Sequence, residues 1–525
     1  MSTETTVPNA KRLLWAGFMA ILAAGVGFAL RGGIFGDWKT AFGFTDGQLG
    51  AIGGAGFSGF CFGIIIGGVL VDKIGYGKLV AVALAGHILS AFVTFGASTP
   101  QNAYDFLYWG MFIFAFANGT LEAVANPLVA TIFPQNRTHY LNILHASWPL
   151  GMMVGVVASG LLGGGIFGIT GLGLSWKIQL GFYLVPTIAY AVMFMGQTFP
   201  KSEAAEKGAS FSEMFKDVGI LGSLVACYLL SIFLGNVLGP VIHINHLGLY
   251  LAGILLIAVG VITRFSFGSL LLFVLFLTHA LVGAVELGTD SWIENITGNL
   301  FTPAEGKLLF FYTSFIMFSL RFCAEFIEKK IGLSPIGLLV TASLIAFGGL
   351  TLASSMTTTT AALIALGIYA LGKTFFWPTM LAVVGDRFPR SGAVAMSIMG
   401  GIGMLSAGLI GGPGLGYAKD RFTAESLQKE APAVYASSKA SSETKFLFLA
   451  PATAVAGDKV EAAKKAGANA TADQKAIVAA NQAGDRATLK ADSYVPLAMA
   501  AIYLLLLFYF KSLGGYRALK IEEQV

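Results

Sequence analysis

The sequence predicts an all-α polytopic membrane protein with about 14 membrane-spanning helices. Its 525 residues are 55% hydrophobic and only 12% charged, a balance that lies outside the range of soluble globular domains. Apolar runs of about 20 residues, long enough to cross a ~30 Å hydrocarbon core as helix, recur along the chain. These runs lack the period-two alternation of a membrane barrel, so we expect helices.

The apolar runs fall into groups of six, two and six. We place the spans at 12–35, 48–71, 79–97, 105–133, 141–168, 178–198, then 218–240 and 246–265, then 270–296, 307–327, 333–353, 361–384, 393–418 and 495–512. This grouping predicts an N-terminal six-helix bundle over 1–198, a cytoplasmic linker over 199–217, an inserted transmembrane hairpin over 218–265 and a C-terminal six-helix bundle over 266–525. The hairpin has few polar groups, which suits helices that face lipid.

The distribution of Lys and Arg predicts the orientation. If the N-terminus is cytoplasmic, most of these residues fall in cytoplasmic loops, and the short loops on the other side hold Lys39, Lys177 and Lys307. The positive-inside rule then places both termini in the cytoplasm. We expect a multi-pass protein of the lipid bilayer of a bacterial inner (plasma) membrane, acting as a monomer and made without a cleavable signal.

A long polar segment separates the last two spans. Residues 419–493 are rich in Ala, Lys, Asp and Ser and lie outside the cytoplasm if the span count holds. The composition of residues 461–490 favours helix, but their apolar periodicity is weak. We interpret this extracytoplasmic insert as a mobile helical or disordered loop rather than a binding domain.

Several classes of function are excluded. Cys61, Cys227 and Cys323 all lie in apolar runs, so they indicate packing rather than a disulfide framework or a metal site. The basic residues are dispersed, which argues against a nucleic-acid partner. There is no GxxxxGK[ST] loop for ATP and no convergent catalytic set. We therefore expect neither an enzyme nor a cofactor, a catalytic residue or a bound metal.

The loop after the second span carries a recognisable motif. GGVLVDKIGYGK, residues 67–78, resembles the loop motif of the major facilitator superfamily, G-x-x-x-D-[RK]-x-G-x-[RK]-[RK], at Gly68, Asp72, Lys73, Gly75 and Lys78. EKKIGLSP, residues 328–335, is a degenerate second copy. The resemblance implies the major facilitator fold of two parallel six-helix repeats and assigns these residues to a conformational gate.

A second segment resembles one family within that superfamily. LEAVANPLVATIFPQNRTHYLNILHASWPLG, residues 121–151, is similar to the LE-x-x-x-NP…LN-x-x-(Q/H) pattern of the fucose, galactose and glucose proton symporters, and VGAVELGTDSW at 282–292 and SLRF at 319–322 are weaker matches. The resemblance implies that Glu122 is protonatable beside the sugar and that His145 contacts the sugar. Asn126 and Asn142 belong to the same pattern and are assigned to the pathway.

Comparison of the two halves pairs four charged residues. Glu122 and Lys373 each precede a proline by five residues, and Arg31 corresponds to Glu286. Parallel halves would place Glu122 and Lys373 at equivalent depths, facing one central cavity. We expect the pairs Arg31–Glu122 and Glu286–Lys373 to line the transport pathway, since ion pairing lowers the cost of burying charge. A purely structural role is the alternative for Arg31.

Further candidates lie near these charges. Asp290 follows Glu286 by one helical turn, and Trp292 and Trp377 fall on elements that we expect to face the cavity, where aromatic rings stack on sugars. Contact with lipid or with the protein core is the alternative for these rings. Arg321 is expected to pair with acids of the cytoplasmic loops as a gate or a structural clamp. For His145, a hydrogen-bonded packing role is an equal alternative to ligand contact.

These observations favour a secondary transporter that moves a small polar solute, a monosaccharide, by proton-coupled alternating access. A second hypothesis is a transporter of an organic or sugar-acid anion bound by Arg31 and Lys373. A third is a transporter-like sensor whose partner binds the insert at 419–493.

Overall fold

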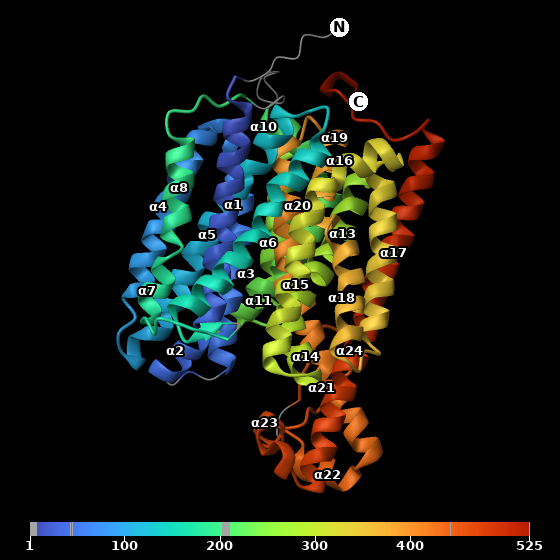
Figure 1. Ribbon diagram of the computed structural model, residues 1–525. Coiled ribbons are helices and arrows are strands. Elements are labelled where there is room, and N and C mark those ends of the chain that lie inside the picture. The colour runs from blue at the N-terminus through green and yellow to red at the C-terminus, as the bar shows by residue number, and fades with distance from the viewer. Residues whose placement is uncertain are drawn as a thin grey trace.

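The structure, a computed structural model, describes residues 8–42, 44, 46–166, 168–201, 210–440 and 443–523. In this part of the chain 13 helices are long and apolar enough to cross a membrane, and Leu247–Ile262 is a shorter apolar helix. Together they agree with the predicted 14 spans. Both termini lie at one end of the molecule, and a small helical domain projects from the other end (Figure 1). We refer to these ends as the termini side and the insert side.

The first bundle consists of six spanning segments. They are α1 (Ala10–Gly33), α3 (Asp46–Ile74), α4 (Tyr76–Phe95), α5 (Pro100–Ile132), α6 (Arg137–Leu162) and the pair α7 (Trp176–Gly181) and α8 (Leu184–Phe194). On the insert side they are joined by α2 (Phe35–Phe42) and by the hairpin of β1 (Gly165–Ile166) and β2 (Ile169–Thr170). The α5 helix begins at Pro100 behind the capping residue Thr99, because proline at the first helical position lacks an N–H that would need a partner.

The second bundle repeats this arrangement with more interruptions. Its segments are α13 (Leu270–Gly283) with η1 (Ala284–Gly288) and α14 (Thr289–Leu300), α15 (Pro303–Leu320) with η2 (Arg321–Cys323), α16 (Ala324–Phe326) and η3 (Ile327–Ile331), α17 (Pro335–Ala353), α18 (Thr359–Lys373) with α19 (Phe376–Arg387), α20 (Gly392–Ser406) with η4 (Ala407–Gly411) and α21 (Gly412–Glu430), and α24 (Ala472–Ser512). The termini side also carries α10 (Phe211–Lys216) and η6 (Ile521–Glu523).

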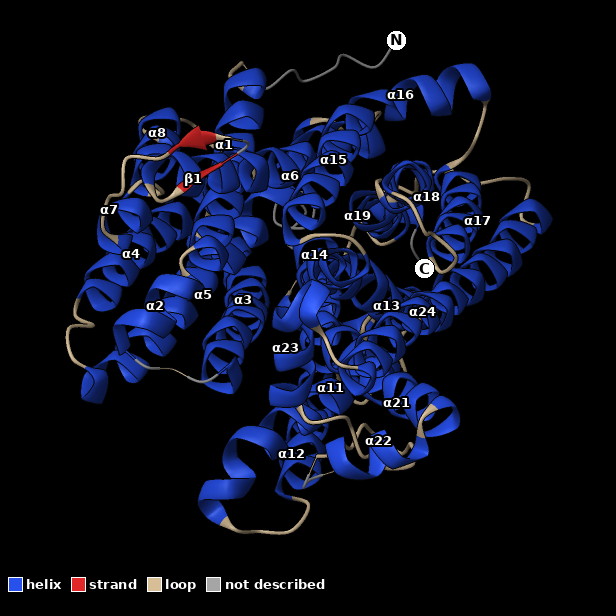
Figure 2. Cartoon of the chain, turned by 60° about the horizontal axis from the view of Figure 1, so that its bottom comes forward, coloured by secondary structure: helices blue, strands red, loops and turns tan. Residues whose placement is uncertain are grey.

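The inserted hairpin consists of α11 (Gly219–Ile242) and α12 (Leu247–Ile262). The α11 helix packs on α13 and α20 of the second bundle, whereas α12 packs mainly on α11 and lies at the periphery (Figure 2). Apolar side chains of α12, including Leu249, Ile254, Ile257 and Val261, are exposed. An apolar exposed face of this kind is what a lipid-facing helix requires.

Glycine allows the closest helix contacts inside the first bundle. A Cβ atom on Gly63 of α3 would lie 2.0 Å from the carbonyl oxygen of Phe116 on α5, and one on Gly151 of α6 would lie 2.3 Å from that of Leu22 on α1. A side chain at either position would push the helices apart. Small residues at such crossings are the usual means of packing helices in a membrane, where apolar burial supplies no driving force between them.

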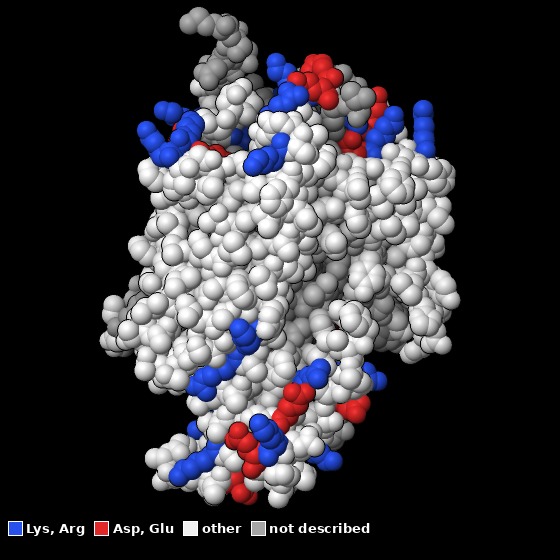
Figure 3. All heavy atoms as spheres, turned by 90° about the vertical axis from the view of Figure 1, so that its right-hand side faces the viewer, with Lys and Arg blue, Asp and Glu red and all other residues white. Residues whose placement is uncertain are grey.

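Charged side chains gather at the two ends of the molecule. The space-filling view shows an uncharged belt between Lys, Arg, Asp and Glu on the termini side and a second charged zone on the insert side (Figure 3). The belt matches the positions of the predicted spans, because a charge facing hydrocarbon is costly. Charged residues within the spans, such as Glu122, Glu286, Arg321 and Lys373, are buried between helices.

The expectation of a mobile loop at 419–493 is wrong for the described residues. The α21 helix runs without interruption from the membrane-spanning segment into the insert, α22 (Pro432–Ser438), α23 (Gly457–Ala466) and η5 (Gly467–Asn469) follow, and α24 extends from the insert through the final span. Leu427, Val455, Ala463, Ile477 and Ala480 form a separate apolar cluster within this domain. The insert is therefore a folded helical domain continuous with two spanning helices.

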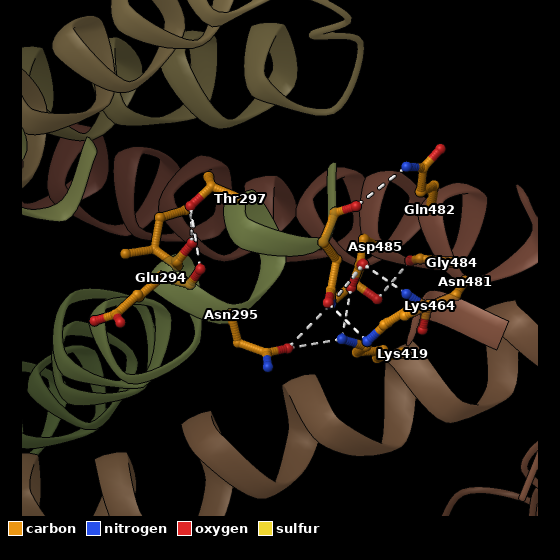
Figure 4. Close-up of polar contacts among 12 residues, drawn as sticks. Glu294, Asn295, Thr297, Lys419, Lys464, Asn481, Gln482, Gly484 and Asp485 are labelled. Atoms are coloured by element: carbon orange, nitrogen blue, oxygen red, sulfur yellow. Dashed lines mark hydrogen bonds and ion pairs between the residues drawn. The ribbon is translucent and has the colours of Figure 1, made fainter. Parts of the chain in front are cut away.

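A polar cluster fastens the insert to the second bundle (Figure 4). Asp485 of α24 is fully buried, forms an ion pair of 3.0 Å with Lys419 of α21, and accepts a hydrogen bond of 3.1 Å from Asn299 Nδ2 in the last turn of α14. Asn299 Oδ1 accepts a hydrogen bond from Lys464 Nζ at 2.8 Å, and the backbone carbonyl of Asn299 accepts one from Gln482 Nε2 at 3.1 Å. Each polar group of the Asn299 side chain is therefore held by the insert.

Candidate functional site

A chain of hydrogen bonds begins at Glu122, in the middle of α5. This carboxylate is only 5% exposed, and Asn126 Nδ2, one turn further along, donates to its Oε2 at 3.4 Å. Asn126 Oδ1 lies 2.9 Å from His145 Nε2 on α6, and because an amide oxygen only accepts, the imidazole carries its proton on Nε2. Among the described side chains, no lysine or arginine forms an ion pair with Glu122.

Arg321 continues this chain into the second bundle. Its guanidinium donates to the carbonyl oxygen of His145, to the carbonyl oxygen of Thr374 at 3.1 Å, and to Glu286 Oε1 at 3.2 Å. Arg321 and Glu286 are 2% and 3% exposed, so both charges are withdrawn from water. The rigid fork of arginine donors suits it to bridge a carboxylate and two carbonyls at once. Glu122 in one half is thus connected to Glu286 in the other.

A second buried ion pair lies beside the first. Lys373, at the end of α18, donates to Asp290 Oδ1 in the first turn of α14, and the lysine is 1% exposed. Next to it, Thr289 Oγ1 donates to Asp492 Oδ2 of α24 at 2.6 Å. Around this pair the second half therefore gathers three carboxylates, Glu286, Asp290 and Asp492, and two cations, Arg321 and Lys373.

Two wide helical turns place these groups. The η1 segment, which contains Glu286, and the η4 segment are π-helical, and they touch: a Cβ on Gly288 would lie 2.8 Å from the Cα of Gly411. A π-turn shifts side chains and carbonyls out of the α-helical register and is frequent at functional sites. In η1 the backbone carbonyl of Val285 accepts a hydrogen bond from Tyr369 Oη at 2.7 Å.

A small cavity of about 90 Å³ lies between the halves, next to the ion pairs. Phe28, Phe57, Phe114, Trp148 and Met152 line it from the first half, and Leu287, Asp290, Ser291, Phe310 and Met404 line it from the second half. The rings of Phe28 and Trp148 are 5.7 Å apart. Aromatic walls with a few polar groups are typical of small-ligand sites.

On the termini side of this cavity the halves are joined by polar contacts. Arg137 of α6 forms an ion pair of 3.1 Å with Asp386 of α19 and donates to the carbonyl of Gly385 at 2.9 Å. One turn closer to the centre, Asn142 Nδ2 lies 3.5 Å from Thr379 Oγ1. The structure is therefore closed on the termini side, and its cavity lies toward the insert side.

Comparison with known proteins identifies the family to which this architecture belongs. The model of the Major Facilitator Superfamily matches residues 17–285, just over half of the chain. The chain belongs to the Major Facilitator Superfamily. The two six-helix bundles, with a cavity at their interface and the termini on one side, are the arrangement expected for parallel repeats related by an axis along the membrane normal.

Individual relatives are similar over different lengths. The L-fucose-proton symporter of Escherichia coli (strain K12) is 31% identical over 122 residues, which are 23% of this chain and little over a quarter, 28%, of the symporter. The solved structure of FucP in the outward conformation has a TM-score of 0.54 at 16% identity, covering 93% of this chain and 98% of FucP. The solved structure of the human organic anion transporter MFSD10 has a TM-score of 0.58 at 15% identity, covering 94% of this chain and 100% of MFSD10. These structural similarities show a shared fold.

The loop motif of this major facilitator lies on the termini side, where α3 meets α20. A Cβ on Gly68 would lie 2.1 Å from Ser397 Oγ, so the first and second halves touch at this glycine. Gly75 has φ +86°, a backbone conformation that favours glycine, and it allows the tight turn into α4. Lys73 and Lys78 are exposed, and the Asp72 side chain lies outside the described atoms. The gate function of the motif stays a prediction.

Both predicted ion pairs are wrong. Arg31 donates to Gly27 O at 3.1 Å, and its guanidinium lies 3.7 Å from the ring centroid of Phe114 and 4.8 Å from that of Tyr183. It therefore points into the first bundle rather than toward Glu122. Glu286 pairs with Arg321, and Lys373 pairs with Asp290, because Asp290 lies one turn closer to the insert side.

The structure also corrects the expected partners of Arg321 and the expected positions of Trp292 and Trp377. Arg321 does not pair with acids of the cytoplasmic loops but with the buried Glu286. Trp377 packs on His279, with ring centroids 4.6 Å apart, and Trp292 Nε1 donates to the carbonyl of Gly412 at 3.0 Å. In the described part of the chain neither tryptophan lines the cavity, whereas Trp148 does.

Two buried polar contacts escaped the sequence analysis, that of Asp492 with Thr289 and that of Arg137 with Asp386. Asp492 precedes the apolar run at 495–512, and extending that predicted span by one turn would have placed the carboxylate inside a helix. Arg137 and Asp386 occupy loop-flanking positions whose charges read as ordinary surface charges, although their side chains are each only 10% exposed in the structure. The partner of such a residue depends on how the two halves dock.

Proposed function

We propose that this major facilitator is a secondary active transporter that moves a monosaccharide by proton-coupled alternating access, with its termini side in the cytoplasm. Aromatic faces that line the cavity can stack on a sugar ring, and Asp290 and Ser291 place polar groups beside them; at about 90 Å³ the cavity must widen to hold a monosaccharide. The local similarity to an L-fucose-proton symporter supports the same class of substrate.

One observation carries the proton-coupling part of this proposal. Glu122 is buried with Asn126 as its hydrogen-bond donor, and the chain through His145 to Arg321 crosses between the halves. An ionised Glu122 would be a buried carboxylate without a cation, whereas a protonated one is neutral. Gain or loss of a proton there therefore changes the electrostatic balance at the contact that must part during alternation.

Transport in proteoliposomes tests this proposal. We expect labelled hexoses to accumulate only when a pH gradient is imposed, and Glu122→Gln to exchange sugar across the membrane without accumulating it. Glu294→Gln is the matched control, because it neutralises an exposed carboxylate at the insert side of α14. Accumulation by Glu122→Gln at the wild-type level would show that the proton is carried elsewhere.

A second candidate function, transport of an organic or sugar-acid anion, is favoured by Arg31. Its Nε and Nη2 atoms are buried without a hydrogen-bond acceptor, behind the Phe114 ring that lines the cavity. Movement of that ring would give an anion access to an uncompensated cation. Lys373 is less available, because Asp290 already neutralises it. Uptake of labelled sugars against sugar acids, with and without Arg31→Gln, separates the two functions.

A further inference from the structure

An exposed apolar turn in the insert has no role in the transport pathway. Thr444 and Ala452 pair as an antiparallel bridge, and the chain between them forms a turn closed by the hydrogen bond from Leu449 N to Phe446 O at 3.0 Å. At the tip, Leu447, Phe448 and Leu449 are 43%, 87% and 41% exposed. Leu447 also has φ +47°, a conformation that turns normally assign to Gly or Asn.

Contacts with α21 fix the level of this tip. Thr444 Oγ1 donates to Asp420 Oδ2 at 2.9 Å, whereas Phe446 stacks on Tyr417 with ring centroids 5.8 Å apart and would touch a Cβ on Gly414 at 3.0 Å. The chain therefore runs back toward the membrane-spanning part of the helix as it approaches the tip. The carbonyl of Ala450 accepts from Tyr417 Oη at 2.6 Å and holds the other arm of the turn at the same level.

That level corresponds to the edge of the hydrocarbon core. The segment that contains α20, η4 and α21 begins at Gly392, beside the charged residues of the termini side, and carries no charge until Lys419. At about 1.5 Å per residue, Gly414 lies roughly 33 Å along the helix, just beyond a hydrocarbon core of about 30 Å. Phe446 thus sits near the boundary between acyl chains and headgroups.

The tip also lies on the outer face of the bundle. Gly412 and Gly416 approach Trp292 of α14, so this face of α21 points into the bundle. At about 100° per residue Gly414 lies on the opposite face, and it is Gly414 that contacts Phe446. The turn therefore lies on the side of α21 that is turned away from α14.

We propose that Leu447, Phe448 and Leu449 insert into the bilayer leaflet on the insert side and anchor the insert to the membrane. The occupant of this apolar surface is lipid, because the tip adjoins the uncharged belt of the molecule and faces outward at the depth of the headgroups. Lys445, exposed at the base of the turn, is placed to contact lipid phosphates while the apolar side chains enter the acyl region.

The depth of a fluorescent label tests the anchor. Phe448→Cys is labelled with an NBD fluorophore in a background whose native cysteines are replaced by alanine, and the protein is reconstituted into vesicles of phosphatidylcholine and phosphatidylglycerol. We expect quenching by lipids with a doxyl group near the top of the acyl chain, and none by iodide present on both sides of the vesicles. Lys429→Cys, exposed at the far end of α21, is the matched control and should show the opposite pattern.

Two results would overturn the proposal. Iodide quenching of the Phe448→Cys label as strong as that of the Lys429→Cys label would place the tip in water. Protection from both quenchers would place it against protein.

A label on Leu449→Cys that loses lipid quenching when Phe448→Asp is added would show that the apolar side chains hold the tip in the bilayer. Unchanged unfolding temperatures in detergent would show that this variant is folded, and the test requires no transport activity.

Discussion

Removal of Arg321 tests whether the central ion pair holds the two halves in the observed state. Arg321→Met leaves Glu286, 3% exposed, without its cation, and deprives the carbonyls of Thr374 and His145 of a donor. Breaking a buried pair by removing one partner costs about 3–5 kcal/mol. We expect a loss of this size in the free energy of unfolding.

A double variant that combines Arg321→Met with Glu286→Leu sharpens this prediction. Glu286→Leu alone leaves a buried guanidinium that still donates to two carbonyls, so its loss should be smaller than that of Arg321→Met. In the double variant no unpaired charge remains, and the stability should recover by about 2 kcal/mol or more relative to the sum of the single losses.

Equilibrium unfolding in mixed micelles, with rising dodecyl sulfate, measures these differences. Lys329→Met is the control, because its ion pair with Glu325, at 2.6 Å, joins side chains that are 56% and 41% exposed, and it should cost only about 0.3–0.5 kcal/mol. Losses that simply add in the double variant would refute the reasoning, since they would mean that Arg321 and Glu286 act independently.

Three further predictions concern other polar contacts. Arg137→Gln removes the ion pair with Asp386 and should increase the labelling of termini-side cysteine probes by a water-soluble maleimide; unchanged labelling would argue against a gate there. Asp485→Ala leaves Lys419, whose side chain is 14% exposed, with Asn295 but without its carboxylate, and should lower the unfolding free energy by about 1.5–3 kcal/mol in micelle titrations, whereas a neutral effect would show that the insert is held by apolar packing alone. Thr289→Val should cost about 1–3 kcal/mol by removing the donor to Asp492, while Asp492→Asn, which keeps an acceptor, should cost less; equal losses would contradict this assignment.

The spans could be predicted from the sequence because continuous apolarity is a local property. The first span of the hairpin, expected at 218–240, is the helix Gly219–Ile242 in the structure. The last span, expected at 495–512, is the end of a 41-residue helix that starts at Ala472. Its polar part needs no apolar stripe, because Asp485 binds Lys419 of α21 and Asn299 of α14, and a small cluster around Ile477 packs the helix within the insert.

The candidate site could be predicted only in part, for a different reason. Comparison of the halves identified Glu122, Glu286 and Lys373 as charges inside spans, and the structure buries all three. Their partners depend on helix rotation and on π-turns, which residue spacing alone does not encode. Arg31 illustrates the point: it occupies the matching place in the first repeat but lies against Phe114 instead of a carboxylate.

The contacts around His145 indicate where the two halves separate during alternation. Its side chain is tied to Asn126 in the first half, whereas the other partners of Arg321, Glu286 and Thr374, belong to the second half. Separation therefore breaks the hydrogen bond between Arg321 and the His145 carbonyl, as well as the contact of Asn142 with Thr379 one turn away, and leaves that carbonyl without its donor. A buried carbonyl without a donor costs free energy. If the substrate is a sugar, as we propose, one of its hydroxyls can replace that donor, and bound substrate would then stabilise the parted state more than an empty cavity does.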